Sequence, residues 1–462
     1  MVIRLFCLMM TATTLAITSL GAAPLTIPAP SIPEIEPRFD VGPSEITKLE
    51  PSCECDRCTN SLMLTRFSPD RQIYYGIISD LPESFKGYGV LYSTRDILDD
   101  CGTTSTPIPL DVRTQIKMPQ FNAIDASFDV FFFHLQIKDK EQAQRLVVSV
   151  KNLGKESVTI EPQQIIKQEG IIGSVHEFES AIATRVMDND WDRPISKVVI
   201  EPGTSEVIAY GKRFGNIDDG NDASRNVNCF GYVRAIINTA DEDARPQLQV
   251  DVLAIPSTPK EEIKTEFVKW LDKAATTTDE VNMTTAPKGC ALGRAVGVYP
   301  YGTIRSLPLV FDAAKLTADG YKFPMALPRV QTEGCPAAAQ TLSLLLRPGN
   351  TREDTIGNYM IPYDVRMGFI NTSDKPVKAQ VLFEKTDADI GLAYRATTKT
   401  TEKRYKGVPV EWKWVGPKQT TTSAPFIQPI TVQPKQQVTF SVNFMIIGNS
   451  SLPFNLCVRA AE

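Results

Sequence analysis

Short runs of β-branched and aromatic residues, separated by turn residues, recur along the first part of the chain. Several of these runs alternate apolar with polar positions, which is the pattern of a half-buried β-strand. The runs are RQIYYGII (71–78), GYGVLYST (87–94), SFDVFFFHLQI (127–137), RLVVSVKN (145–152) and SVTIEP (157–162). The pattern predicts an all-β fold built from antiparallel sheets.

Two pairs of segments repeat the same plan in the same order. In VVSVKNLGKESVTIEP (147–162) and VRMGFINTSDKPVKAQVLFE (365–384), a strand runs into Asn152 or Asn371 and a new strand begins six residues later. Later, VVIEPGTSEVIAYG (198–211) and ITVQPKQQVTFSVNF (430–444) each read as strand, Pro turn and strand. Asparagine suits hairpin turns because it tolerates positive φ. The repeat predicts two similar antiparallel β-sandwich domains, 52–256 and 289–462.

One segment between these domains has helical periodicity. In STPKEEIKTEFVKWLDKA (257–274), Thr258 stands at the N-cap position, and Ile263, Phe267 and Trp270 form one apolar stripe. We expect a linker of one short helix and a loop over 257–288, with the stripe packed on a sandwich edge or between the domains.

The N-terminus has the layout of an export signal. Arg4 precedes an apolar run that ends in small residues near Ala23, so residues 1–23 are expected to be a cleaved signal peptide. An uncleaved membrane anchor is the alternative. Residues 24–51 carry a proline every few positions and are expected to form an extended spacer. The mature chain has no further transmembrane run, which predicts a secreted protein, periplasmic or extracellular.

Charge excludes some classes of partner. The 462-residue chain has a formal net charge of -5, and no basic run or arm stands out along it. Nucleic acid and anionic membrane surfaces are therefore not expected as partners.

The cysteines suggest disulfides. Eight lie outside the signal segment, and an even number in an exported chain is typical of a disulfide framework: Cys53, Cys55, Cys58, Cys101, Cys229, Cys290, Cys335 and Cys457. The cluster CECDRC could instead bind zinc or serve as a redox site. A zinc site lacks a nearby fourth ligand, and a redox C-x-x-C would normally open a helix. We therefore expect disulfides, and the pairing stays open.

Several short segments resemble, in order, a family of uncharacterised exported bacterial proteins, chiefly cyanobacterial, catalogued as a domain of unknown function. The segments are GVLYST, FDVFFFHL, TRVMDND, FVKWLD, GRAVGVYPYGT and GNYMIPYDVRMGFINTSDKPVKAQV, and the resemblance covers roughly residues 70–460. The family has two adjacent histidines where this chain reads Phe133-His134. The resemblance implies an export route and a shared topology, but no reaction.

Motifs for catalysis are sparse. The chain has two histidines, His134 in an apolar strand and His176, and it lacks the G-x-S-x-G, H-E-x-x-H, P-loop and G-x-G-x-x-G motifs. We expect His134 to be a hydrogen-bonded strand residue. A carboxylate-dependent hydrolase, such as a glycosidase with its site between the domains, remains the alternative to a non-catalytic protein.

Two groups of residues could bind ligands. In DNDWD, Asp188, Asp190 and Asp192 alternate as at the start of a calcium loop, although Arg193 stands where an EF-hand has its glycine. A calcium site or a solvated acidic turn would both fit, and no other cofactor is indicated.

The second group is aromatic. Trp412 and Trp414 lie two residues apart in EWKW, and Tyr299 and Tyr301 lie two apart in YPYGT. Residues at i and i+2 share a strand face, so each pair could stack on a sugar ring or a partner protein. The alternative for the two tryptophans is that both point into the sandwich core. Three sequons, at Asn282, Asn371 and Asn449, would mark surface loops if the source is eukaryotic.

From these features we expect a disulfide-stabilised, non-catalytic protein of the cell surface or extracellular space. Its expected partners are polysaccharides or other matrix components. A sandwich scaffold does not by itself decide between this function and a hydrolase, because function depends on the site carried by the fold.

Overall fold

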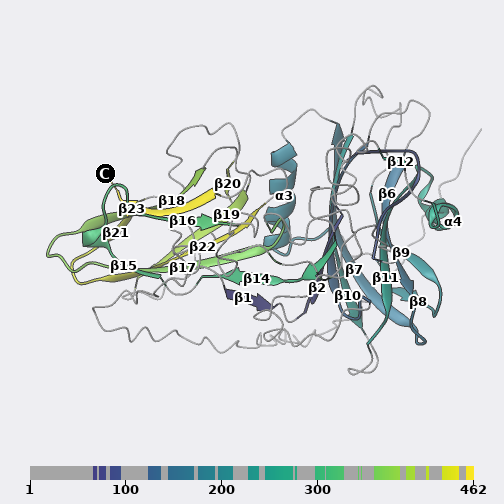
Figure 1. Ribbon diagram of the computed structural model, residues 1–462, viewed down its shortest axis with the longest axis horizontal. Coiled ribbons are helices and arrows are strands. Elements are labelled where there is room, and N and C mark those ends of the chain that lie inside the picture. The colour runs from purple at the N-terminus through teal and green to yellow at the C-terminus, as the bar shows by residue number, and fades with distance from the viewer. Residues whose placement is uncertain are drawn as a thin grey trace, which may run out of the picture. The chain divides into compact units, whose positions relative to one another are not determined.

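A computed structural model describes residues 66–69, 72–79, 84–94, 123–136, 144–170, 175–192, 196–211, 227–238, 245–273, 276–277, 297–306, 309–326, 342, 345, 358–385, 392–400, 413–415, 429–446 and 454–461. All of them belong to one compact unit, Glu50–Glu462. Strands form nearly all of the regular structure in this part of the chain, so the predicted all-β class is confirmed (Figure 1).

The first sandwich consists of sheets B and C. Sheet B has the order β12 (Thr276–Thr277), β3 (Ser84–Lys86), β5 (Phe128–Gln136), β10 (Val227–Asn238), β7 (Val158–Gly170), β8 (Val198–Ile200), with β2 (Tyr75–Ser79) joining β5 to β13 (Gly297–Pro300). Sheet C has the order β4 (Gly89–Ser93), β11 (Leu248–Pro256), β6 (Gln144–Asn152), β9 (Ser205–Tyr210).

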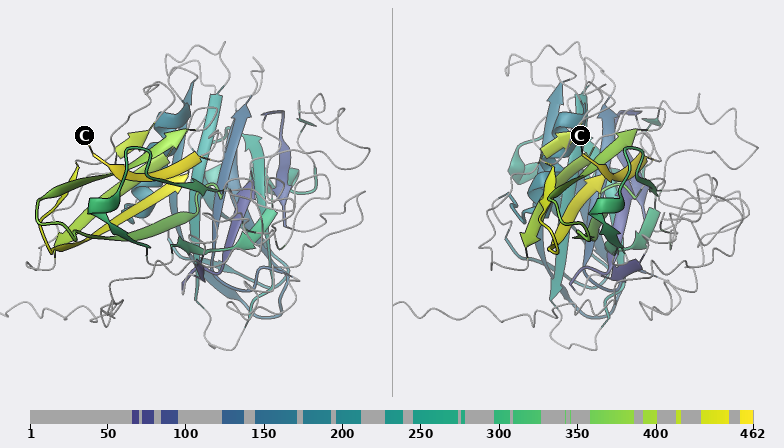
Figure 2. Two further views of the ribbon diagram at one scale, coloured as in Figure 1. Left: turned by 60° about the vertical axis from the view of Figure 1, so that its left-hand side comes forward. Right: turned by 90° about the vertical axis from the view of Figure 1, so that its left-hand side faces the viewer.

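The second sandwich consists of sheets A and D, drawn from green to yellow in Figure 2 except for the purple strand β1. Sheet A has the order β1 (Arg66–Pro69), β14 (Gly302–Arg305), β17 (Pro362–Ile370), β22 (Gln437–Ile446), β19 (Leu392–Thr400), β20 (Lys413–Val415), and β15 (Leu309–Asp312) also pairs with β17. Sheet D has the order β16 (Tyr321–Met325), β23 (Phe454–Ala460), β18 (Val377–Lys385), β21 (Ile430–Val432).

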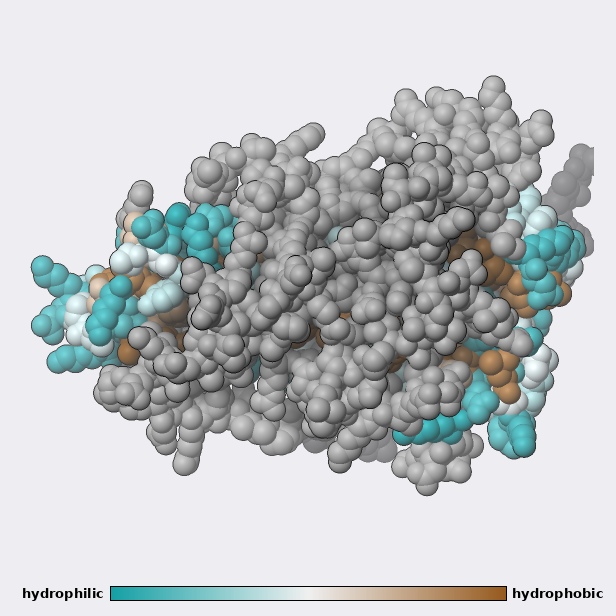
Figure 3. Space-filling view, in the orientation of Figure 1, coloured by the Kyte–Doolittle hydropathy of each residue, from teal (hydrophilic) through white to brown (hydrophobic). Residues whose placement is uncertain are grey.

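Alternating apolar residues hold the sheets of the second sandwich together. In β22, every second residue from Val438 to Phe444 is buried, and the residues between them are less so. Phe444 of sheet A meets Phe383 of sheet D edge to face, with ring centroids 5.3 Å apart. Such aromatic pairs add to the free energy gained by burial, so this contact helps to fix how the two sheets face each other. Among the described residues drawn in Figure 3, hydrophilic ones lie on α4 and on the hairpin tips of the second sandwich.

The strand orders confirm the internal repeat. Sheet B contains the order β5-β10-β7-β8, and sheet D has the order β16-β23-β18-β21. The neighbouring hairpins correspond as well, because β9 pairs with β6 and β22 pairs with β17. Each strand of the second set thus takes the place that its counterpart has in the first set.

A buried asparagine closes each copy of the repeat. In the first copy, the Asn152 Nδ2 group donates to the carbonyl oxygens of Glu156, at 2.7 Å, and Ile200, at 3.0 Å. Its Oδ1 atom accepts from the Gly154 amide at 2.9 Å. Since Asn152 ends a strand of sheet C and Ile200 ends a strand of sheet B, one side chain joins the two sheets.

The second copy repeats these contacts. The Asn371 Nδ2 group donates to the carbonyl oxygens of Lys375, at 2.7 Å, and Val432, at 2.9 Å. Its Oδ1 atom accepts from the Ser373 amide at 2.9 Å. We call Asn152 and Asn371 the lock asparagines. Because Asn371 is 2% exposed and its amide is engaged, the folded chain does not present this sequon as a surface acceptor.

The main chain around each lock asparagine also matches. The Asn152 carbonyl accepts from the amide of Gly203, which has φ +73°, and the Asn371 carbonyl accepts from the amide of Lys435, which has φ +58°. The second copy therefore keeps a left-handed turn residue although it has lost the glycine that usually adopts this conformation.

The structure contains the predicted linker helix and a second helix that the sequence analysis did not predict. Helix α4 (Ile263–Trp270) follows a 3₁₀ turn, η2 (Lys260–Glu262), and buries Ile263 and Phe267 as expected. Thr258 is not its cap, because the side chain makes no cap hydrogen bond and the helix begins five residues later. Helix α3 (Val175–Met187) lies between β7 and β8, where no helix was expected. A further 3₁₀ turn, η3 (Ala313–Lys315), follows β15.

Two strand pairings cross the linker expected at 257–288. Strand β1 precedes the first sandwich in sequence but pairs with β14 of sheet A, and β13 follows the linker but pairs with β2 of sheet B. Each half of the chain therefore supplies a strand to the sheet of the other half. The two sandwiches are joined by sheet hydrogen bonds as well as by side chains.

We predict that replacing either lock asparagine by alanine destabilises the protein by about 2–4 kcal/mol, because one buried carbonyl and one partly buried carbonyl lose their donor. Urea unfolding of Asn152→Ala and Asn371→Ala measures the change. Glu156→Ala and Lys375→Ala are matched controls, since they keep the main-chain carbonyl acceptors. Equal stability of the asparagine variants and their controls would contradict the role of the lock asparagines.

Candidate functional site

A buried ion pair joins the two central strands of sheet B. Asp129 of β5 lies directly across from Arg234 of β10, and the guanidinium donates to both carboxylate oxygens, at 2.9 and 2.8 Å. The Tyr232 hydroxyl donates to the same carboxylate at 2.7 Å. Burial favours the neutral form of Arg234, but the charge of Asp129 and its hydrogen bonds outweigh this and raise the Arg234 pKa.

Tyr301 extends this network into the second half of the chain. Its hydroxyl oxygen lies 3.0 Å from that of Tyr232. Tyr299, two residues earlier, packs its ring against Gly76 of β2, where any side chain would clash: a Cβ atom on Gly76 would lie 2.1 Å from the ring. Tyr299 is 1% and Tyr301 4% exposed. The prediction that Tyr299 and Tyr301 form an exposed sugar-binding platform is therefore wrong. Both side chains are buried where the two halves of the chain contact each other.

The acidic loop DNDWD borders the same network. The Trp191 ring packs on the Arg234 guanidinium, 4.8 Å from the ring centroid, and tilts against Tyr232. The flanking carboxylates of Asp190 and Asp192 both pair with Arg185, at 3.0 and 2.9 Å.

The Arg185 pairs bear on the calcium prediction. A cation at this loop would compete with the Arg185 guanidinium for two of the three carboxylates, and Asp188, the third, is exposed. Across the described ranges, no three His, Cys, Asp or Glu side chains gather as a metal-binding set. The geometry is that of an acidic turn neutralised by an arginine.

The predicted tryptophan pair is described only in part. Trp414 lies on β20, across from Ala393 of β19, and Trp412 lies outside the described residues. The proposed tryptophan platform thus stays a prediction.

His134 is a hydrogen-bonded strand residue, as expected. Its Nε2 atom lies 3.0 Å from the Ser79 hydroxyl oxygen, and both side chains are fully buried. Serine and histidine at this distance can act as nucleophile and base when a substrate reaches them. Here neither group is accessible to solvent, so the pair contributes to packing between β2 and β5. His176 lies in α3.

Two of the eight cysteines are in the described part of the chain. Cys229 is buried in β10, across from His134. Cys457 of β23 is a free thiol that contacts a Glu384 carboxylate oxygen at 3.5 Å, so the disulfide expected for it is not formed in this structure. Burial, with the Glu384 charge, raises the pKa of Cys457 to about 12. The other predicted disulfide residues lie outside the described residues: Cys53, Cys55, Cys58, Cys101, Cys290 and Cys335.

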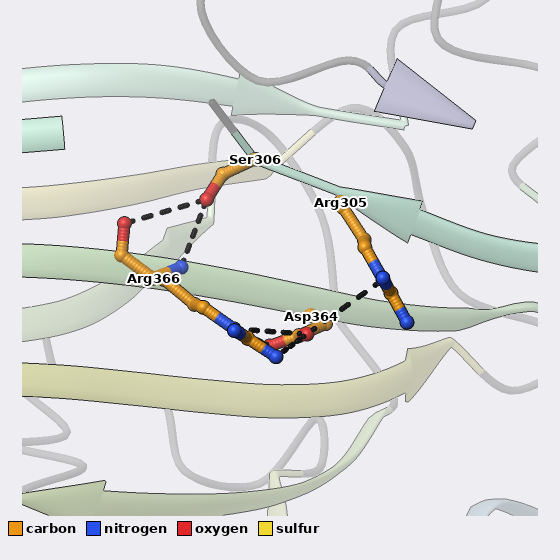
Figure 4. A network of polar contacts seen from close by, with 4 residues as sticks. All are labelled: Arg305, Ser306, Asp364 and Arg366. Carbon is orange, nitrogen blue, oxygen red and sulfur yellow. Dashed lines mark hydrogen bonds and ion pairs between the residues drawn. The ribbon is translucent and has the colours of Figure 1, made fainter. Parts of the chain in front are cut away.

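The outer face of sheet A carries an exposed charged group (Figure 4). The Arg366 guanidinium binds the Asp364 carboxylate through Nε, at 3.1 Å, and Nη2, at 2.9 Å. Arg305 reaches the same carboxylate only as a 3.9 Å ion pair. The Ser306 hydroxyl accepts from the Arg366 amide at 2.8 Å. Two guanidinium groups that are 51% and 57% exposed thus share one carboxylate, which leaves a positive charge facing solvent.

Sequence reasoning missed both charged groups. Asp129 and Arg234 lie more than one hundred residues apart in the sequence, and no local pattern marks either of them. Only the register of β5 and β10 shows that they pair. The D-x-R spacing of Asp364 and Arg366 was a usable signal, because residues two apart on a strand share a face. Arg305 has no such local partner.

Compared with known proteins, the chain matches no family model. No curated protein matches it. In the part of the chain that the structure describes, no helix combines the length and apolar character needed to cross a membrane.

We predict that Asp129→Asn destabilises the protein by about 3–5 kcal/mol, because it leaves the largely buried Arg234 without a counter-charge. The matched control is Asp190→Asn, which removes the exposed carboxylate of the Arg185–Asp190 pair. Its expected loss in the free energy of unfolding is below about 1 kcal/mol. Urea unfolding measures both. A loss for Asp129→Asn no larger than that of the control would contradict the structural role of the pair.

We predict that Cys457 resists alkylation by iodoacetamide at pH 8 in the folded protein and reacts readily in urea. Burial blocks access, and a pKa of about 12 keeps the thiol protonated. Mass spectrometry of the tryptic peptide 436–459, in which Cys457 is the only cysteine, measures the labelling. Rapid labelling without urea, or a disulfide on this peptide, would contradict the structure.

Proposed function

We propose that the protein is an exported, non-catalytic component of the cell surface or extracellular space that binds polysaccharide or matrix partners. The N-terminal signal pattern supports export, and so does the resemblance of short segments to exported bacterial proteins. The cysteine content supports disulfide stabilisation, with the six expected disulfide cysteines outside the described residues as its candidates.

The observation that carries this proposal is where the charged groups lie. Two buried polar groups that resemble catalytic ones, Asp129 and the Ser79–His134 pair, are engaged with neighbouring side chains in the interior. The outer face of sheet A, by contrast, carries the exposed side chains of Arg305 and Arg366 beside a single carboxylate. A broad polar sheet face suits binding of an extended ligand better than it suits catalysis, which needs a reacting atom held among converging groups.

The alternative is a carboxylate-dependent hydrolase. Among the described carboxylates, Asp129 is held by an arginine in the interior, and Asp364 is held by one at the surface. A catalytic acid must present its carboxyl group to the substrate, and both of these carboxylates are already bound by an arginine guanidinium. Neither residue therefore suggests the acid of a glycosidase.

We predict that the purified full chain binds glycans on an array and releases no reducing sugar from the same polysaccharides. The array is run with calcium and with EDTA, and calcium-dependent binding would implicate the loop of Asp188, Asp190 and Asp192. Proteins of the extracellular matrix are printed on the same array as further candidate ligands. Release of reducing sugar, or the lack of any bound glycan or matrix protein, would overturn the proposed function.

A further inference from the structure

The outer face of sheet A collects basic residues from distant parts of the chain. Strand pairing places five residues in one row across β1, β14, β17, β22 and β19. Arg66 lies across from Arg305, Arg305 beside Asp364, Asp364 across from Asn443, and Asn443 across from Arg395. Three of the five positions are arginine, and one is acidic.

The next positions along these strands continue the pattern. Arg366 lies across from Ser441, which lies across from Thr397, and Thr439 lies across from Lys399. We call this set the basic face: Arg66, Arg305, Asp364, Arg366, Arg395, Thr397, Lys399, Thr439, Ser441 and Asn443. Five of its members are basic and one is acidic, although the whole chain has a net charge of -5.

The internal repeat shows that this face is a departure from the first copy. Val147 and Arg366 each stand five residues before their lock asparagine, so they occupy equivalent positions. Val147 is buried in an apolar cluster with Ile263 and Phe267 of α4. Arg366 is exposed instead. One copy of the repeat thus covers its outer sheet face with a helix, and the other presents charge there.

Neighbouring basic positions on a sheet repel each other. Strands lie about 4.8 Å apart and alternate residues about 7 Å apart along a strand, so the basic positions form a closely spaced array. Like charges directly across a sheet are destabilising, and a bound anion offsets such repulsion. A ligand with several anionic groups along its length fits this array better than a single ion does.

The side chains between the charges indicate which polyanion. Serine, threonine and asparagine supply hydroxyl and amide groups that can bind sugar hydroxyls. Arginine binds carboxylates through two parallel hydrogen bonds. Single-stranded nucleic acid is usually held by stacking on several aromatic residues, whereas the register of the described strands places one aromatic residue, Trp414, at this face, across from Ala393. We propose that the basic face binds acidic polysaccharide, with Arg305 and Arg366 holding its carboxylates. This rests on the proposed binding function and names the ligand class.

The test compares binding of the full chain to polygalacturonate, a uronic-acid polymer, and to dextran, a neutral one, by calorimetry. We expect binding to polygalacturonate that weakens as salt is added. Arg305→Gln/Arg366→Gln should weaken it by about tenfold or more, since each arginine supplies a charge-assisted hydrogen bond. Lys155→Gln/Lys375→Gln is the control: it removes the same charge at two exposed hairpin residues, one in each copy.

Two further measurements separate the possible outcomes. The first is the single variant Arg305→Gln, which leaves the Arg366–Asp364 pair intact. A thermal melt of each variant checks that a loss of binding does not come from unfolding. Asp364→Asn should strengthen binding, because it frees the Arg366 guanidinium. Equal loss in the control variant, or tighter binding of a DNA oligonucleotide than of polygalacturonate, overturns the basic-face proposal. Binding of neutral glycans alone also overturns it and leaves the proposed function standing.

Discussion

The lock asparagines are the constraint on which both sandwiches depend. A sandwich must satisfy the main-chain groups at its sheet ends, and an unpaired buried carbonyl costs about 1–3 kcal/mol. Each lock asparagine satisfies two carbonyls, one in its own hairpin and one at the end of a strand in the opposite sheet. A shorter or apolar side chain at this point would leave the two sheets without this connection.

The same constraint explains what has diverged between the copies. Residues near the locks are kept, down to the left-handed turn at Gly203 and Lys435. Residues on the outer faces differ: Val147 is buried beneath α4, whereas Arg366 at the equivalent position is exposed. The segments inserted between equivalent strands differ as well: α3 follows β7, whereas β19 and β20 follow β18. The locks therefore conserve the fold and leave the outer faces free to change.

The repeat, the strands and the linker helix could be predicted because each has a local pattern. Asn152 and Asn371 stand at the same distance from the next strand, and Ile263 and Phe267 have helical spacing. Helix α3 was missed because its segment follows a long strand closely, although Ser174 and Glu177 have the spacing of a capping box at the start of the helix. Burial of Tyr299 and Tyr301 could not be foreseen, since it depends on β13 pairing with β2, more than two hundred residues earlier. The basic face has the same origin: its arginines come from four separate strands and form no run in the sequence.

The two charged networks differ in what surrounds them, and this difference separates structure from function in the protein. Asp129 and Arg234 form a matched pair in the interior, with Tyr232 completing the carboxylate's hydrogen bonds and Trp191 covering the guanidinium. Such a pair has no capacity left for a ligand. On sheet A, one carboxylate faces two guanidinium groups and solvent replaces the covering ring. An unequal number of charges is a stable arrangement only where water or a partner can supply the rest. The surplus of arginine on this sheet face is therefore the feature of the protein on which the proposed binding function depends most directly.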